Sequence, residues 1–165
     1  GSKIQQIISN LSYFFKKNTK SGSKKNIHAH YDLGNDFYKL WLDSTMTYSS
    51  AIFNDSKESL SDAQNNKYDR IIDRIGSGNK EILEIGCGWG GFAERVKNKT
   101  KYRLDGITIS REQLNFANDR LKNSSRTKLN FCDYRDIQKK YDAIVSIEMF
   151  EAVGEEILAF IFFSN

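Results

Sequence analysis

The sequence contains no proline and only two cysteines and two histidines. Two cysteines are too few for a disulfide scaffold, so Cys87 and Cys132 are expected to be reduced thiols in a cytoplasmic protein. Because His28 and His30 are the only histidines and there is no C-x-x-C pair, no four-ligand zinc site is expected, nor any other metal site. No apolar run approaches the roughly 20 residues that span a bilayer, and the N-terminus lacks the apolar core of a secretory signal. These absences argue against a disulfide-rich, zinc-binding or membrane-spanning protein.

The 165 residues have the composition of one globular domain, with 39% hydrophobic and 28% charged residues. Positive charge is concentrated at the start, because residues 1–31 contain six lysines and no acidic residue. Apolar residues recur at helical spacing from Ile4 to Leu11, which predicts an amphipathic helix followed by a basic linker over residues 1–27. Such a helix can lie on an anionic membrane surface or pack against the domain, and both interpretations stay open. Nucleic acid is not an expected partner, because the basic residues are not spread over a recognisable reading motif.

Residues 28–165 alternate between strand-like and helix-like patterns, which predicts an α/β domain. The predicted strands cover residues 81–85, 102–109, 128–132 and 142–147. The predicted helices cover residues 31–43, 59–74, the stretch from the glycine cluster to about 98, and 111–121, with an irregular segment at 44–58. Short connections between alternating elements favour a parallel sheet built by right-handed crossovers. The predicted fold is therefore a Rossmann-like sheet of four parallel strands with N-terminal helices.

A glycine-rich turn follows the first predicted strand and reads E-I-G-C-G-W-G-G from Glu84 to Gly91. It contains G-x-G-x-x-G, in which Gly86 and Gly88 allow a tight turn and a close approach of the backbone to a ligand. The helix behind the turn presents free N–H groups at its N-terminus. The turn therefore indicates a nucleotide-type ligand, although such turns can also be purely structural.

The residues around this turn distinguish between nucleotides. A nicotinamide site expects an acid at the end of the second strand, where this chain has Thr108, Ile109 and Ser110. Glu84, just before the first glycine, is instead suited to the ammonium group of S-adenosylmethionine. After the third strand, Asp133-Tyr134 can receive an adenine by hydrogen bonding and aromatic packing. The lysine and serine of a P-loop are absent, which argues against phosphoryl transfer.

Six stretches of the sequence follow one another in a distinctive order and spacing. They are H-Y-D-L-G-N-D-F-Y-K-L-W-L-D (30–43), M-T-Y-S-S-A-I-F (46–53), L-E-I-G-C-G-W-G-G (83–91), G-I-T-I-S-R-E-Q (106–113), D-Y-R-D (133–136) and S-I-E-M-F-E-A-V-G (146–154). Together they resemble the cyclopropane-fatty-acyl-phospholipid synthase and mycolic acid cyclopropane synthase family over about residues 28–156. The resemblance implies an S-adenosylmethionine-dependent methyltransferase of the class I, seven-stranded α/β type, represented here by part of its sheet.

The resemblance also implies a role for each matching residue. Tyr48 and Ser49 close over the cofactor, the glycine-rich turn holds its methionine part, and Gln113 replaces the acid that usually meets the ribose. The implied cofactor-binding residues are Tyr48, Ser49, Glu84, Gly86, Cys87, Gly88, Gly90, Gly91, Thr108, Ser110, Gln113, Asp133 and Tyr134.

The reaction of the family implies catalytic residues as well. In family members the cis double bond of an acyl chain attacks the sulfonium methyl group, and the carbocation loses a proton to bicarbonate as the ring closes. Glu151 matches the glutamate that orients bicarbonate, and Ser50 stands where some relatives have cysteine. His30 is a candidate to line the active site, or a structural histidine at a helix start. Ala152 stands where many relatives have histidine and cannot donate a hydrogen bond.

The C-terminal end departs from the family. Relatives continue well past the position of Gly154, whereas this chain ends in an apolar run at residues 157–163. The resemblance thus predicts a truncated or split form of a cytoplasmic enzyme that contacts unsaturated membrane phospholipid peripherally, as a homo-oligomer or with a complementing C-terminal fragment. Two alternatives stay open: an inactive remnant that binds the cofactor only, and a methyltransferase for another small molecule.

Overall fold

A computed structural model of the chain describes residues 34–147. Several predictions concern residues outside this range: the N-terminal helix and linker at 1–27, His30, Glu151 and the apolar run at 157–163. Within residues 34–147, no helix has the length and apolar character needed to cross a membrane. In the same range, no group of three or more His, Cys, Asp and Glu side chains is placed to hold a metal ion.

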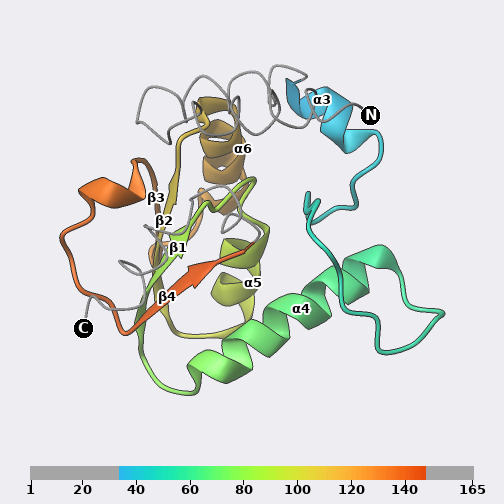
Figure 1. The fold of residues 1–165 in the computed structure, drawn as a ribbon, viewed down its shortest axis with the longest axis horizontal. Coiled ribbons are helices and arrows are strands. Elements are labelled where there is room, and N and C mark those ends of the chain that lie inside the picture. The colour runs from blue at the N-terminus through green and yellow to red at the C-terminus, as the bar shows by residue number, and fades with distance from the viewer. Residues whose placement is uncertain (1–33, 148–165) are drawn as a thin grey trace, which may run out of the picture.

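The described residues form a four-stranded parallel sheet with the strand order β3-β2-β1-β4 (Figure 1). Its strands are β1 (Glu81–Ile85), β2 (Arg103–Thr108), β3 (Thr127–Phe131) and β4 (Ala143–Ser146). In the register, Ile85 lies beside Ile107 of β2 and Ser146 of β4. The carboxyl ends of three strands therefore meet at one edge, which is where ligands bind in open α/β sheets.

Within residues 34–147, four helices and one 3₁₀ turn accompany the sheet. They are α3 (Gly34–Lys39), α4 (Leu60–Ile75), α5 (Gly91–Lys99), α6 (Arg111–Leu121) and the 3₁₀ turn η1 (Tyr134–Asp136). Helices α4 and α6 begin where a serine side chain accepts a backbone N–H: Ser59 from Asp62, and Ser110 from Gln113. Helix α5 begins instead after Gly90, which has a left-handed backbone and no side-chain cap. The N-terminus of α5 thus follows the glycine-rich turn at the carboxyl end of β1.

The main core lies between the sheet and helices α4, α5 and α6. Phe92 of α5 and Leu104 of β2 are each 1% exposed, and full burial of such a side chain contributes about 1.5–3 kcal/mol. A smaller cluster that includes Ile85 packs against side chains from residues 132–141. Because side chains alternate along a strand, Ile85 faces this cluster and Glu84 faces the helices.

The predicted fold class is confirmed, and every predicted strand matches an observed one to within one residue at each end. Residues 44–58 are irregular, as predicted. The helix predicted over 31–43 is described only from Gly34 and ends at Lys39, because the chain turns at the next two residues. Phe37 and Trp41 belong to an apolar stripe at helical spacing in this segment, but they do not join the core, because they remain 40% and 53% exposed.

Candidate active site

The glycine-rich turn forms a tight loop at the carboxyl end of β1. Gly86, Gly88 and Gly90 have φ values of 76°, 52° and 81°, a region that residues with side chains rarely adopt. The backbone N–H groups of Gly86 and Cys87 both donate to the carbonyl oxygen of Ile107, so the loop crosses the end of β2. The positive φ values explain why the sequence places glycine at alternate positions here.

Residues 44–49, which we call the cover segment, pack directly against this glycine loop. A Cβ atom at Gly91 would lie 2.8 Å from the carbonyl oxygen of Thr45 and 2.9 Å from the hydroxyl oxygen of Tyr68. Such distances are too short for a real Cβ atom. Only glycine at position 91 therefore allows the cover segment to approach the loop so closely.

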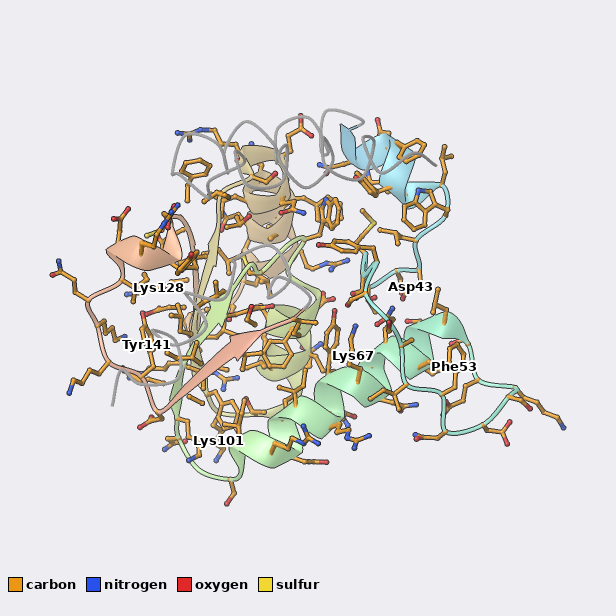
Figure 2. The ribbon with its side chains drawn as sticks, viewed as in Figure 1. Asp43, Phe53, Lys67, Lys101, Lys128 and Tyr141 are labelled. Atoms are coloured by element: carbon orange, nitrogen blue, oxygen red, sulfur yellow. The ribbon has the colours of Figure 1, made fainter. Side chains whose placement is uncertain are left out.

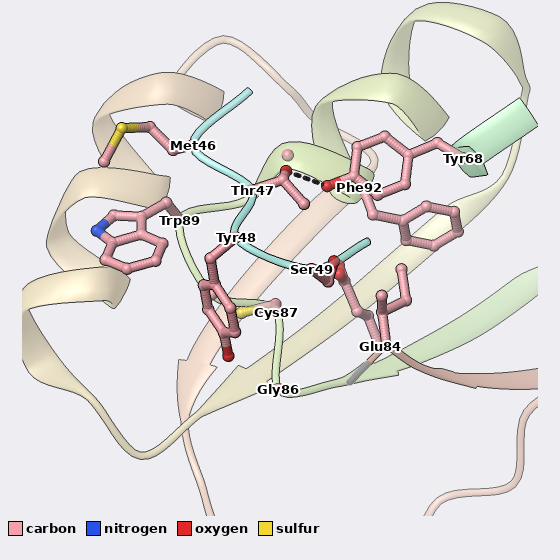
Figure 3. Close-up of a pocket in the computed structure, with 13 residues that line it drawn as sticks. Met46, Thr47, Tyr48, Ser49, Tyr68, Glu84, Gly86, Cys87, Trp89 and Phe92 are labelled. Atoms are coloured by element: carbon pink, nitrogen blue, oxygen red, sulfur yellow. Dashed lines mark hydrogen bonds between the residues drawn. The ribbon is translucent and has the colours of Figure 1, made fainter. Parts of the chain in front are cut away.

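Helix α4 holds the cover segment through three buried polar side chains. Gln64 Nε2 donates to the carbonyl oxygens of Ser49 at 2.7 Å and Thr47 at 3.3 Å. Lys67 Nζ donates to Ser49 Oγ at 2.5 Å. Figure 2 labels the side chain of Lys67. The hydroxyl groups of Tyr68 and Thr47 share a short hydrogen bond (Figure 3). The conformation of the cover segment thus depends on α4.

A cavity lies between the cover segment, the glycine loop and the end of β1, and its volume is about 50 Å³ (Figure 3). This volume suits a small polar group better than a whole nucleotide. The rest of such a ligand would extend along the carboxyl edge of the sheet. The cavity brings together seven of the predicted cofactor-binding residues: Tyr48, Ser49, Glu84, Gly86, Cys87, Gly88 and Gly91.

Glu84 is the only acidic residue among those that line the cavity. Its side chain is buried, with 3% of the residue exposed, and Oε2 has no hydrogen-bond partner among residues 34–147. Burial raises the pKa of this carboxyl group to about 8, because the charged form is poorly solvated there. A buried acceptor without a partner is costly, and a ligand ammonium group would supply one. The cavity therefore fits the cationic amino group for which Glu84 was predicted.

Two further residues of the loop have local structural roles. Burial raises the pKa of the Cys87 thiol well above its usual value, so the thiol stays protonated and unreactive. Gly90 does not line the cavity, and a Cβ atom there would lie 3.0 Å from Cβ of Ala117 on α6. Gly90 thus sets how closely the loop packs against α6.

The residues predicted to meet the ribose form a buried group between β2 and α6. Thr108 Oγ1 donates to Gln113 Oε1 at 3.2 Å and accepts from the Ser110 backbone N–H at 3.1 Å. Ser110 Oγ in turn accepts from the backbone N–H of Gln113 at 3.3 Å. The three side chains are brought together after β2, with the Gln113 carbonyl oxygen already engaged by Thr108, but none of them is among the residues that line the cavity.

The pair predicted at the adenine lies after β3, in and just before η1. The Asp133 carboxylate accepts two hydrogen bonds from the Arg135 guanidinium, at 2.8 Å from Nε and 2.5 Å from Nη2. It also accepts the backbone N–H of Arg135, which caps η1. The hydroxyl of Tyr134 is buried and has no hydrogen-bond partner within the described part of the chain, and its ring packs against the cluster around Ile85. Asp133 thus helps to shape this turn.

The three predicted catalytic residues are not brought together in the described part of the chain. Ser50 is exposed, follows the cover segment and is not among the residues that line the cavity. His30 and Glu151 lie outside the described residues. Their catalytic roles stay predictions.

Several cavity residues were not singled out as site residues from the sequence. Thr47 and Trp89 lie inside the quoted motifs, and Tyr68 lies in the helix predicted over residues 59–74. A signal for Tyr68 did exist, because a buried tyrosine hydroxyl needs a polar partner. Its partner, Thr47, lies 21 positions away along the chain and could not be identified from spacing.

The family model described as mycolic acid cyclopropane synthetase matches residues 18–165 of this chain. The chain belongs to this family. The resemblance drawn from the six sequence stretches is therefore confirmed, and the family is one of S-adenosylmethionine-dependent methyltransferases.

Curated relatives of this cyclopropane synthetase family member act on lipids, according to their names. The chain is 40% identical over 140 residues to a probable fatty acid methyltransferase of Pseudomonas putida, and the match covers 81% of this chain and 35% of that protein. It is also 40% identical over 126 residues to the cyclopropane-fatty-acyl-phospholipid synthase of Escherichia coli strain K12, covering 76% of this chain and 32% of that protein. The chain thus spans about a third of the length of these relatives.

The solved structures agree with the family assignment. The crystal structure of mycolic acid cyclopropane synthase CmaA1, complexed with SAH and CTAB, matches with a TM-score of 0.76 and 34% sequence identity. The match covers 81% of this chain and 48% of CmaA1. The parallel sheet and helices of the family member therefore have the class I S-adenosylmethionine-dependent methyltransferase fold.

Proposed function

We propose that this chain carries the cofactor site of an enzyme that adds a methylene group from S-adenosylmethionine to the cis double bond of an unsaturated phospholipid acyl chain, forming a cyclopropane ring. The name of the Escherichia coli relative supports the substrate, and the SAH in the CmaA1 structure supports the cofactor. S-adenosylmethionine would supply an electrophilic methyl group on its sulfonium centre.

Glu84 supports the choice of cofactor. Its unpartnered Oε2 is buried at the end of β1 and can accept a hydrogen bond from the ammonium group of the methionine part. Gly91 and Phe92, the first two residues of α5, line the same cavity, and a carboxylate is favoured at a helix N-terminus. A zwitterionic amino-acid group matches both features.

An aromatic path from the cavity to the surface carries the proposal of a lipid substrate. Tyr48 and Trp89 line the cavity, with ring centroids 6.2 Å apart. The ring centroids of Trp89 and Tyr38 are 4.9 Å apart. The ring centroid of Tyr38 lies 5.8 Å from that of Trp41 and 5.6 Å from that of Phe37. Tyr48, Phe37 and Trp41 are at least 40% exposed, so the path continues onto the molecular surface. Apolar rings in this arrangement suit an acyl chain better than a polar metabolite.

The aromatic rings also suit the proposed chemistry. Rings beside the transferred methyl group would exclude water from a carbocation and stabilise its charge through their electron-rich faces. We further propose that bicarbonate accepts the proton that is lost on ring closure. Glu151 and Ser50 would hold the bicarbonate, and His30 would line the active site. In this proposal the chain positions the reactants, and no side chain forms a covalent bond to them.

The proposal includes peripheral contact with the membrane at the cytoplasmic side, because the substrate is an acyl chain of a bilayer lipid. The lysines of residues 1–31 would attract anionic headgroups, each adding about 1 kcal/mol near the surface. At the other end of the described residues, β4 pairs with β1 on one side, and no strand within residues 34–147 pairs with its other side. That side can accept a strand from a complementing C-terminal fragment or from a second copy.

The test is a turnover assay on the full chain with S-adenosylmethionine and phosphatidylglycerol vesicles. Vesicles with cis-monounsaturated chains are compared with saturated ones, and the acyl chains are analysed by gas chromatography and mass spectrometry. Cyclopropane product from unsaturated chains only, lost in Glu84→Ala, is the expected result. Cofactor binding without product would favour the alternative of a cofactor-binding module, and methylation of another added acceptor would favour a different methyltransferase.

A further inference from the structure

Arg120 of α6 connects the cover segment to the glycine loop. This residue lies outside the sequence stretches that the cofactor motifs cover. Its Nη1 donates to the carbonyl oxygens of Thr45 at 2.9 Å and Trp89 at 3.2 Å. Its Nη2 donates to the carbonyl oxygen of Ser44 at 2.6 Å. A single guanidinium group thus joins two segments that are far apart in sequence and that both border the cavity.

The surroundings of Arg120 hold its guanidinium group in this position. The side chain is only 10% exposed, its Nε lies 3.7 Å from Glu94 Oε2, and the guanidinium lies 5.2 Å from the ring centroid of Phe116. The guanidinium group of arginine is planar and can donate to three carbonyl oxygens in different directions. Lysine carries a single compact ammonium group and cannot reproduce this arrangement.

The backbone next to these carbonyl groups is strained. Met46 has a φ of 55°, and no other non-glycine residue in the described range has a positive φ. Met46 is buried and lines the cavity. Such a conformation persists only when the surrounding structure imposes it, and it is concentrated at functional sites. Arg120 holds the residues before Met46, while Tyr68 and Gln64 hold Thr47 after it.

We propose that Arg120 is a positioning residue that locks the cover segment onto the glycine loop and thereby sets the affinity of the cavity for the cofactor. The part that concerns affinity rests on the proposed function. Arg120 itself does not line the cavity, so it acts through the backbone of residues 44–46 and Trp89. The lock itself is a property of the free protein and can be measured without a ligand.

The experiment compares Arg120→Met and Arg120→Lys with a matched control, Arg126→Met. Arg126 also donates to two backbone carbonyl groups, of Thr100 and Lys97, but these lie at the end of α5 away from the cavity. Amide hydrogen exchange is measured on each free protein, because the N–H groups of Thr45 and Met46 both donate to Asp43 and should be protected. Binding of S-adenosylhomocysteine is measured in parallel by calorimetry.

We expect Arg120→Met and Arg120→Lys to raise exchange at residues 45 and 46 by about 10-fold and to weaken S-adenosylhomocysteine binding by about 10-fold, with α4 unchanged. Arg126→Met should change neither quantity. Unchanged exchange at residues 45 and 46 in Arg120→Met, or an equal effect of Arg126→Met on them, would overturn the proposal. If the wild-type chain binds no S-adenosylhomocysteine, the proposed function fails, and the exchange comparison still decides the role of Arg120.

Discussion

The ammonium group of Lys67 donates a hydrogen bond to Ser49 Oγ across a distance of 2.5 Å, with both side chains buried. Lys67 Nζ also lies 5.2 Å from the ring centroid of Tyr68. A buried lysine is uncommon, and this one places a positive charge directly behind the cover segment. The pair links helix α4 to the residues that close the cavity.

Replacing Ser49 with alanine should therefore destabilise the protein. The variant removes a hydrogen bond to a buried charged group, which costs about 1.5–3 kcal/mol in the free energy of unfolding. Urea denaturation measures the change. Ser44→Ala is the control, because its hydroxyl is exposed and forms a hydrogen bond with the hydroxyl of Ser61; the effect of this substitution should stay below about 0.5 kcal/mol. Equal effects of the two substitutions would contradict the role given to the Lys67–Ser49 pair.

Glu84 should make the free protein less stable as the pH rises. Its pKa is about 8 in the folded chain and lower in the unfolded chain, so the unfolded state loses its proton first. The Glu84 contribution is fully favourable below the unfolded pKa and is lost as the pH rises through about 8. Each unit of pKa difference corresponds to about 1.4 kcal/mol.

Glu84→Gln removes this titration. Urea denaturation at pH 5 and pH 8 should show the variant gaining stability over the wild type by a few kcal/mol between the two values, on the scale of about 1.4 kcal/mol per pKa unit. Glu112→Gln, which changes an exposed carboxylate on α6, should follow the wild type. A pH-independent difference between wild type and Glu84→Gln would show that Glu84 is not the buried acid described above.

Cofactor binding should release a proton from the same carboxyl group. At pH 7 the free protein holds Glu84 mainly protonated, and an ammonium group beside it favours the carboxylate. Titrations with S-adenosylhomocysteine in buffers of different ionisation enthalpy should therefore show release of close to one proton per ligand. The Glu84→Gln variant should release none. Binding by the wild type without any buffer dependence would argue for a different ligand contact.

Gly91→Ala should disturb the cover segment by steric contact alone. The new Cβ atom would lie 2.8 Å from the carbonyl oxygen of Thr45, and Gly91 is not among the glycines with positive φ. We expect a loss of about 1–3 kcal/mol in unfolding free energy and weaker S-adenosylhomocysteine binding. Gly88→Ala is the comparison: its φ of 52° adds backbone strain, but no atom lies within 4 Å of the new Cβ. If Gly91→Ala binds as tightly as the wild type, the cover segment does not limit access to the cavity.

The sheet could be predicted closely because its signals are local. Three of the five residues of β1 are apolar, glycines with positive φ follow the strand, and Ser59 and Ser110 cap the helices that begin beside them. Each of these patterns depends on neighbours a few positions apart. The strand, the glycine loop and the position of Glu84 at the end of β1 are therefore readable from the sequence, whereas the cofactor-binding role of these residues stays a prediction.

The packing around the cavity could not be predicted in the same way. Arg120 contacts Ser44 and Thr45 across more than seventy positions of sequence, and no local pattern indicates that pairing. Helical periodicity identified the stripe of Phe37 and Trp41 but not whether anything covers it. The positive φ of Met46 has no sequence signal, because only surrounding contacts can impose it on a residue with a side chain.

The two tryptophans occupy opposite environments, and this gives the protein two optical reporters. Trp89 is 2% exposed in the cavity wall, whereas Trp41 is 53% exposed at the outer end of the aromatic path. The sequence has no other tryptophan. A dissolved quencher would reach Trp41 and reduce its fluorescence, whereas the fluorescence of the buried Trp89 would remain. Fluorescence without any label can therefore distinguish a ligand that enters the cavity from a lipid that settles on the surface beside it.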